Sequence, residues 1–89
     1  MSTENVDITP AQVRGARALL EMTQPELAKE AGLGLSTVVD FEKSRRRISA
    51  DARDALKRAL EDAGVVFISE NGGGIGVRLS KARKRAAPR

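Results

Sequence analysis

The sequence contains no cysteine, histidine, tryptophan or tyrosine. Without cysteine and histidine, the chain has no disulfides, no thiolate or imidazole metal ligands, and no Cys–His or Ser–His catalytic pair. Its two phenylalanines are also too few for the aromatic platform on which single-stranded nucleic acids stack. We therefore expect no cofactor, no metal and no enzymatic activity.

Long apolar runs are missing as well, and the first residues lack the basic and apolar regions of a signal peptide. We therefore predict a soluble, cytoplasmic protein without membrane contact. The 89 residues suffice for one small domain with a thin core. Such a domain often gains stability by dimerising.

The net charge of +4 is unevenly distributed along the chain. Residues 80–89 hold five basic side chains and no acid, so residues 1–79 hold 11 bases against 12 acids. We predict a basic, disordered tail at 80–89, which serves either a phosphate-rich partner or solubility alone. Residues 1–8 are polar and are predicted to form an N-terminal arm.

Capping residues and the spacing of apolar side chains predict four helices within residues 9–63. Thr9, Thr23 and Ser49 are suited to begin helices, and Gly32 is suited to end one in the left-handed conformation. Gly15, inside the first helix, indicates close packing of another element against it. The predicted fold class is mostly α, a compact four-helix domain.

Residues 64–79 have a different character. Residues 65–68 (VVFI) and 75–79 (IGVRL) are rich in β-branched residues, and glycine-rich turn formers separate them. The sequence therefore predicts a short C-terminal β-hairpin, which alone would be marginal in water. It must pack on the helices, pair with a second copy, or both. We predict dimerisation through this element, by Val65, Val66, Phe67 and Ile68.

The segment from Thr23 to Glu42, TQPELAKEAGLGLSTVVDFE, is the strongest functional signal. Two short amphipathic helices flank a glycine-containing turn, as in a helix-turn-helix, whose second helix enters the major groove of DNA. The alternative is an ordinary helical hairpin in a small bundle. Apolar Leu35 and Val39, on the side predicted to face solvent, and the basic loop that follows favour DNA binding.

The pattern T-Q-x-E-L-A-x-x-A-G followed by S-T-V-x-x-F-E resembles the XRE/Cro and phage-repressor class of helix-turn-helix proteins, over about residues 9–63. This resemblance implies that Gln24 holds a phosphate and that Arg17 and Glu42 form a structural ion pair. Gly34, Leu35 and Asp40 depart from the usual residues of the class. The DNA-binding positions that the resemblance implies are Gln24, Leu35, Ser36, Thr37, Val39, Asp40, Lys43, Arg45, Arg46 and Arg47.

The residues of the expected reading surface differ in what they offer DNA. Leu35 and Val39 could contact thymine methyl groups, and Ser36 could bond several bases. Asp40 could accept a hydrogen bond from cytosine N4, or it could repel phosphate and exclude wrong registers.

The sequence thus predicts a sequence-specific regulator of transcription that binds double-stranded DNA, with repression as its expected output. It would bind a near-palindromic operator as a homodimer, with its recognition helices about 34 Å apart. Two alternatives stay open. One is an antitoxin or adaptor whose hairpin or basic tail binds a partner protein, and the other is a non-specific architectural DNA binder. The expected location is the cytoplasm, at the nucleoid.

Overall fold

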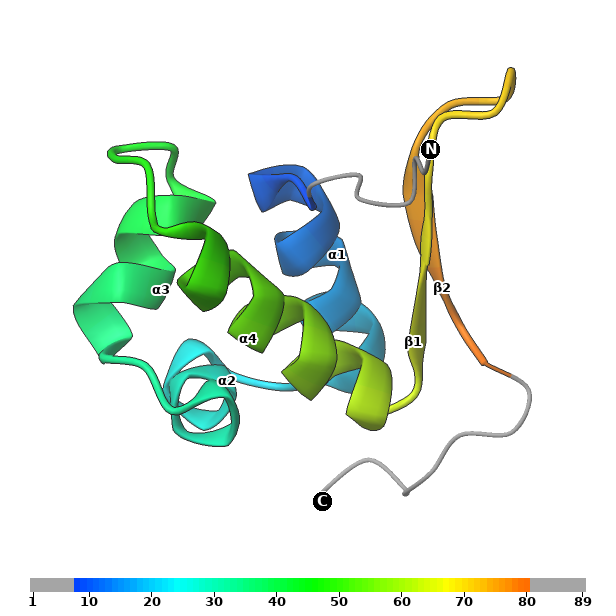
Figure 1. Ribbon diagram of the computed structural model, residues 1–89. Helices are drawn as coiled ribbons and strands as arrows, with labels where there is room; N and C mark the ends of the chain where they lie inside the picture. The colour runs from blue at the N-terminus through cyan, green and yellow to red at the C-terminus, as the bar shows by residue number, and fades with distance from the viewer. Residues whose placement is uncertain (1–7, 81–89) are drawn as a thin grey trace.

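The computed structural model describes residues 8–80 (Figure 1). Its elements are α1 Pro10–Leu20, α2 Gln24–Ala31, α3 Leu35–Glu42, α4 Ala50–Asp62, β1 Val65–Ile68 and β2 Gly76–Leu79. The predicted fold class, a mostly α four-helix domain followed by a β-hairpin, is confirmed. Between residues 8 and 80, no helix has the length and apolar character required to cross a bilayer. The predicted arm, except Ile8, and the predicted tail, except Ser80, lie outside the described residues.

Three of the helices begin at the predicted N-cap residues. The side chains of Thr9, Thr23 and Ser49 each accept a hydrogen bond from the backbone N–H three residues later. For Thr9 and Thr23 the side chain at that later position bonds back to the cap, which completes a capping box. Helix α3 begins at Gly34, which provides no side-chain cap. Its start therefore depends on packing and on the preceding turn.

Helices α1, α2 and α3 share one type of ending. A residue in the left-handed conformation follows each helix: Glu21 (φ 59°), Gly32 (φ 71°) and Ser44 (φ 57°). The next N–H then donates to a carbonyl five residues back, which is the Schellman arrangement. These bonds are Met22 N to Arg17 O, Leu33 N to Ala28 O, and Arg45 N to Asp40 O. Gly32 was predicted in this role, whereas Glu21 and Ser44 were not, because a Cβ disfavours this conformation.

The core lies between the four helices and one face of the hairpin. Its fully buried side chains include Val13, Ala16, Leu27, Val38, Leu56 and Leu60. Ile8 is also buried, at 5% exposure, and belongs to this core. The prediction that residues 1–8 form a polar arm is therefore wrong for Ile8, because its apolar side chain is covered by the folded domain.

The hairpin packs on the helices, chiefly on α1 and α4 (Figure 1). Its strands are antiparallel, with Val65 opposite Leu79 and Phe67 opposite Val77. These four side chains share one face and pack against the core. The Cβ of an alanine at Gly15 would lie 3.3 Å from Val77 Cγ2, so Gly15 permits the close packing that the sequence indicated.

A buried polar side chain also ties the hairpin to α1. Gln12 is 7% exposed, and its Nε2 donates to the carbonyls of Ile68 (3.3 Å) and Gly76 (3.0 Å). Ile68 and Gly76 face each other across the two strands. A single amide therefore holds both strands where the hairpin leaves the helical domain.

Candidate nucleic-acid interface

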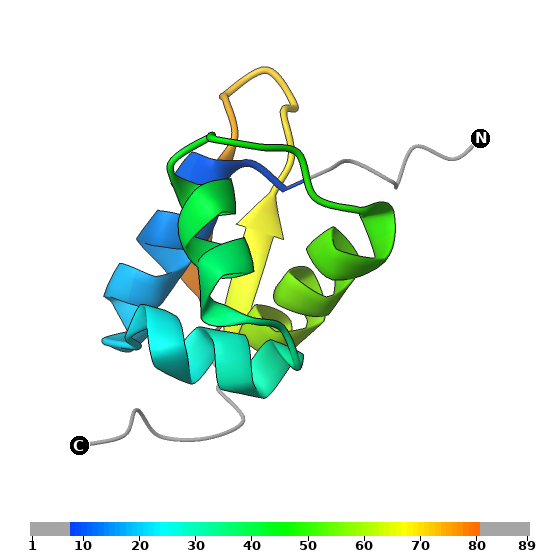
Figure 2. The same cartoon turned by 90° about the vertical axis from the view of Figure 1, so that its left-hand side faces the viewer.

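Helices α2 and α3 form one end of the molecule, away from the hairpin (Figure 1). Each has eight residues, and the turn between them comprises residues 32–34. Leu33 is half-buried against the core, so the turn is anchored at its centre. Viewed from this end, α3 lies in front and crosses α2 at a steep angle (Figure 2). The predicted pair of short helices with a tight turn is therefore present.

Helix α3 has one buried side and one accessible side. Val38, Phe41 and Glu42 are buried, at 0%, 6% and 2% exposure. Among the side chains predicted to face DNA, Leu35 and Ser36 are exposed, and Thr37, Val39 and Asp40 are partly exposed. At about 100° per residue, Ser36 and Asp40 lie opposite the buried side. The buried side thus fixes the helix on the domain, and the other side remains accessible from solvent.

The basic loop after α3 folds back along this helix. The left-handed conformation of Ser44 reverses the chain, and Arg45 N then donates to Asp40 O at 2.8 Å. Further along, Ile48 is buried, and its carbonyl accepts a hydrogen bond of 2.9 Å from Arg53 Nη1. The loop is therefore attached at both ends, and the side chains of Arg45 and Arg46 lie beside α3.

Two of these arginines meet Asp40, the acid on the accessible side of α3. Arg46 Nε lies 3.6 Å from Asp40 Oδ2, and Arg45 Nη1 lies 3.9 Å from Asp40 Oδ1. Arg46 Nη2 also donates to Thr37 Oγ1 at 3.1 Å. The sequence suggested two roles for Asp40, as an acceptor from cytosine or as a source of repulsion. Its contacts with arginines were not anticipated.

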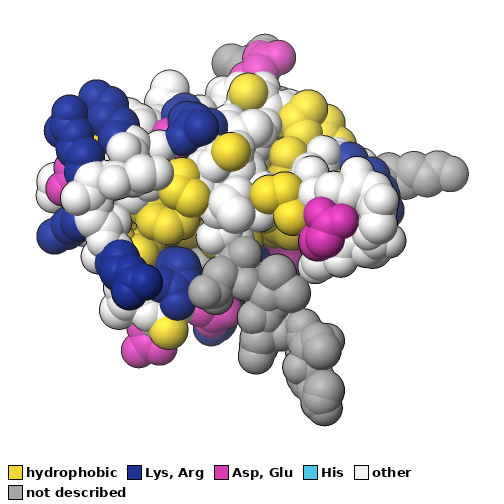
Figure 3. Space-filling view, turned by 90° about the horizontal axis from the view of Figure 1, so that it is seen from above, with side chains coloured by type: hydrophobic (Ala, Val, Ile, Leu, Met, Phe, Trp, Pro, Cys, Tyr) yellow, Lys and Arg dark blue, Asp and Glu magenta, His cyan; other side chains and the backbone are white. Residues whose placement is uncertain are grey.

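Positive charge gathers over the end of the molecule that carries α3 and its loop (Figure 3). Lys43, Arg45, Arg46 and Arg47 are all exposed there. An open hollow beside the loop is lined by Pro10, Phe41, Ser44, Arg46, Arg47, Ile48 and Arg53. The surface therefore combines cationic side chains with an apolar floor.

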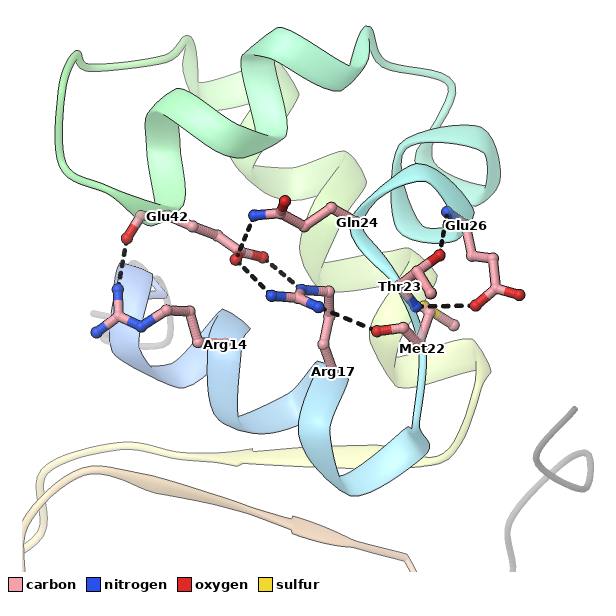
Figure 4. A network of polar contacts seen from close by, with 7 residues as sticks. All are labelled: Arg14, Arg17, Met22, Thr23, Gln24, Glu26 and Glu42. Carbon is pink, nitrogen blue, oxygen red and sulfur yellow. Dashed lines mark hydrogen bonds and ion pairs between the residues drawn. The ribbon is translucent and has the colours of Figure 1, made fainter. Parts of the chain in front are cut away.

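Glu42, at the end of α3, is the centre of a polar network that joins three helices (Figure 4). Arg17 Nε donates to Oε2 at 2.7 Å and Arg17 Nη2 to Oε1 at 2.8 Å. Arg17 Nη1 donates to the carbonyl of Met22 at 3.1 Å. The structure thus places Arg17 and Glu42 together, and the two-point contact fixes α3 against α1.

The hydrogen bonds to Glu42 raise the pKa of the Arg17 guanidinium above its ordinary value, against the opposing effect of burial. Because the pKa is higher in the folded state than in the unfolded chain, the ion pair contributes fully to the stability of the fold at every pH below the unfolded-state pKa. This contribution is lost only as the pH rises through the folded-state pKa. Arg17 therefore stays charged at every pH that proteins ordinarily meet.

Gln24, at the start of α2, belongs to the same network. Its Nε2 donates to Glu42 Oε1 at 3.0 Å (Figure 4). A primary amide carries two hydrogens on this nitrogen, so one N–H remains to donate to another acceptor. Gln24 is partly exposed, at the N-terminus of a helix, where the dipole favours an anion. The position is thus compatible with a phosphate contact.

Arg14 is a member of the network that the sequence did not reveal. Its Nη1 donates to the backbone carbonyl of Glu42 (Figure 4). Carbonyls at a helix C-terminus carry partial negative charge, and a cation there is favourable. The position of Arg14 could have indicated this contact, because residues three apart in a helix are neighbours and Arg14 lies three residues before Arg17.

The hairpin residues predicted to mediate dimerisation are split between two faces. Val65 is buried, and Phe67 lies on the face that packs on the core. Both side chains therefore pack within their own protomer. Their neighbours along the strand point the other way, because side chains of a strand alternate between its two faces. Val66 and Ile68 lie on the outer face and are partly exposed.

No protein-family model matches the chain, and none of the curated proteins matches its sequence. Among residues 8–80, no group of three or more Asp or Glu side chains is placed to hold a metal ion. The surface around α3 combines an accessible helix side with exposed basic side chains.

Proposed function

We propose that this chain is a sequence-specific regulator of transcription that binds double-stranded DNA through α3, as XRE/Cro-type proteins do. The observation that carries the proposal is the combination of a buried and an accessible side on α3, with an arginine-rich loop fixed beside it. A short helix that projects from a domain in this way fits the major groove. Repression is the expected output, in the cytoplasm at the nucleoid.

Two sets of residues would divide the work of binding. Lys43, Arg45 and Arg47 on the loop and Gln24 at the start of α2 would contact phosphates, which supply most of the affinity. Leu35, Ser36 and Val39 would meet base edges and methyl groups. The network at Glu42 keeps these two sets in a fixed relation, because it joins the ends of α1, α2 and α3.

The proposed DNA contact has a direct test with a matched control. Ser36 and Ser69 are both exposed, but Ser36 lies on α3 and Ser69 follows β1 in the hairpin. Ser36→Glu places a negative charge on the accessible side of α3, in the first turn of the helix, where an acid is tolerated. It should abolish binding to a mixed duplex pool, whereas Ser69→Glu should bind as the wild type does. Equal binding by both variants would contradict the proposal.

We propose that the regulator acts as a homodimer whose contact lies at the hairpin. The sheet has only two strands, so each has one edge without a partner strand in the described chain. Packing the outer face on a second copy would place the two α3 helices at opposite ends of the dimer, because the hairpin and α3 lie at opposite ends of a protomer (Figures 1 and 2). Pairing along a strand edge places the protomers side by side, so we favour it.

The two modes of dimerisation differ in their response to charge on the outer face. Val66→Lys combined with Ile68→Lys would disrupt face-to-face packing but leave the backbone edges intact. Analytical ultracentrifugation should therefore find a dimer for both this variant and the wild type. A variant that becomes monomeric would show that the outer face is the contact, and a monomeric wild type would exclude a homodimer.

The alternative of a partner-binding adaptor or antitoxin also has an observation in its favour. Ile75, at 47% exposure, adds to the apolar surface of the hairpin, together with Val66 and Ile68. On this reading, Ser36→Glu would leave the biological activity unchanged, while Val66→Lys with Ile68→Lys would remove it. The non-specific architectural alternative predicts instead that all duplex sequences compete equally.

A further inference from the structure

Arg46 is held against α3 by two side chains of that helix. Its Nε lies 3.6 Å from Asp40 Oδ2, and its Nη2 donates to Thr37 Oγ1 at 3.1 Å. Thr37 and Asp40 are three residues apart and therefore neighbours on one side of the helix. The Arg46 side chain is nevertheless 51% exposed. The guanidinium is thus oriented by α3 while it remains open to a ligand.

The accessible side of α3 itself has few hydrogen-bond donors. Leu35 and Val39 are apolar, Asp40 is an acceptor, and Ser36 has a single hydroxyl. Guanine presents two acceptors in the major groove, O6 and N7, and is best matched by two parallel N–H donors. None of these four side chains provides such a pair.

We infer that Arg46 is a base-reading residue that donates to guanine O6 and N7, and that Asp40 and Thr37 position it. The inference rests on the proposed DNA-binding function. Nε lies towards Asp40, and Nη2 donates one hydrogen to Thr37. The adjacent edge of the guanidinium therefore carries N–H groups from Nη1 and from the second hydrogen of Nη2 in one plane. This edge has the spacing that binds an acceptor pair.

Asp40 therefore acts through the arginine rather than on the DNA. Its carboxylate restrains a long side chain that would otherwise lose considerable rotamer freedom on binding a base. It also lies 3.9 Å from Arg45 Nη1, so it reduces the cationic charge that the loop offers to phosphates in general. An acid in this position thus favours specific over non-specific binding.

The test uses two substitutions whose effects must be coupled. Sites are first selected with the wild-type protein from random duplexes, and each guanine is then replaced by 7-deazaguanine, which lacks the N7 acceptor but pairs normally. The affinity of the wild type should fall by about tenfold at one guanine per half-site. Arg46→Met removes every donor but keeps a long unbranched side chain, so the affinity of this variant should be insensitive to the same replacement.

The control is Arg47→Met, the same change at the next exposed loop residue, which should keep the full sensitivity to 7-deazaguanine. Asp40→Asn should lose this sensitivity and also bind unrelated duplexes more tightly. A residue that served stability alone would not produce that pair of effects.

The outcomes separate this inference from the proposed function. Selected sites at which Arg46→Met remains as sensitive as the wild type would show that Arg46 does not contact guanine N7, and would overturn the inference alone. A selection that enriches no sequence would overturn the proposed function, and this inference with it. If sensitivity to 7-deazaguanine is lost on substitution of Arg46 and Asp40 but not of Arg47, the base-reading role of Arg46 is established.

Discussion

Arg17 and Glu42 meet as a two-point ion pair between α1 and α3, with N–O distances of 2.7 and 2.8 Å. The Glu42 side chain is only 2% exposed, so Arg17 compensates a carboxylate that water hardly reaches. The same carboxylate accepts a hydrogen bond from Gln24. The pair therefore positions both the helix proposed to enter DNA and the residue proposed to hold a phosphate.

Removal of Arg17 should destabilise the fold strongly. Arg17→Ala leaves the Glu42 charge buried without its partner, at an expected cost of about 3–5 kcal/mol. The control is Arg58→Ala, since Arg58 pairs with Asp54 within α4 at the surface, with side-chain exposures of 71% and 54%. That variant should lose less than about 0.5 kcal/mol. Urea denaturation measures both, and an Arg17→Ala protein as stable as Arg58→Ala would refute the structural role.

The contact between Gly15 and Val77 should show coupling in a double-mutant cycle. Gly15→Val places extra methyl groups where a Cβ alone would already lie 3.3 Å from Val77 Cγ2, so we expect a loss of about 1–3 kcal/mol. Removing the opposing methyl groups with Val77→Ala should relieve part of this cost. Denaturation of the two single variants and the double variant checks the result. Strictly additive losses would mean that the hairpin does not pack on α1 at this point.

The two faces of β1 should respond differently to truncation. Phe67 packs on the core, so Phe67→Ala should cost about 2 kcal/mol or more. Val66 lies on the outer face, so Val66→Ala should cost less than about 1 kcal/mol. Thermal unfolding distinguishes them. A larger loss at Val66 than at Phe67 would show that the outer face is buried in solution by a partner or a second copy.

Ser44 is a position where glycine should improve stability. The left-handed conformation, at φ 57°, costs a residue with a Cβ about 1 kcal/mol relative to glycine. Ser44→Gly should therefore raise the Tm by about 4–8 °C, as expected for a domain of this size. Calorimetry gives the answer, and a lowered Tm would indicate that the Ser44 side chain has a stabilising role. Because the turn is retained, DNA affinity should not change.

Much of the fold follows from local signals in the sequence. Thr9, Thr23 and Ser49 cap helices by hydrogen bonds within three residues of themselves, so a short stretch of sequence defines each start. The same holds for Gly32, whose missing Cβ suits the left-handed position that it occupies. Arg17 and Glu42 lie 25 residues apart, and only the family resemblance paired them in advance.

The features that sequence reasoning missed depend on tertiary packing. Gln12 binds carbonyls 56 and 64 residues away, and nothing in its own segment indicates this. Ile8 was assigned to an arm because the few apolar residues among residues 1–8 form no periodic pattern. The contact between Arg46 and Asp40 was not predicted, because it depends on the reversal of the chain at Ser44.

The central claim is that the accessible side of α3 reads a DNA sequence. The most direct measurement is a selection from random duplexes of about 30 base pairs, performed with the full chain at two salt concentrations. We predict a near-palindromic motif with half-sites about 10 base pairs apart, and an affinity for it that falls steeply as salt increases. The motif should disappear for Ser36→Glu and persist for Ser69→Glu. Equal recovery of all sequences by the wild-type protein would contradict the claim.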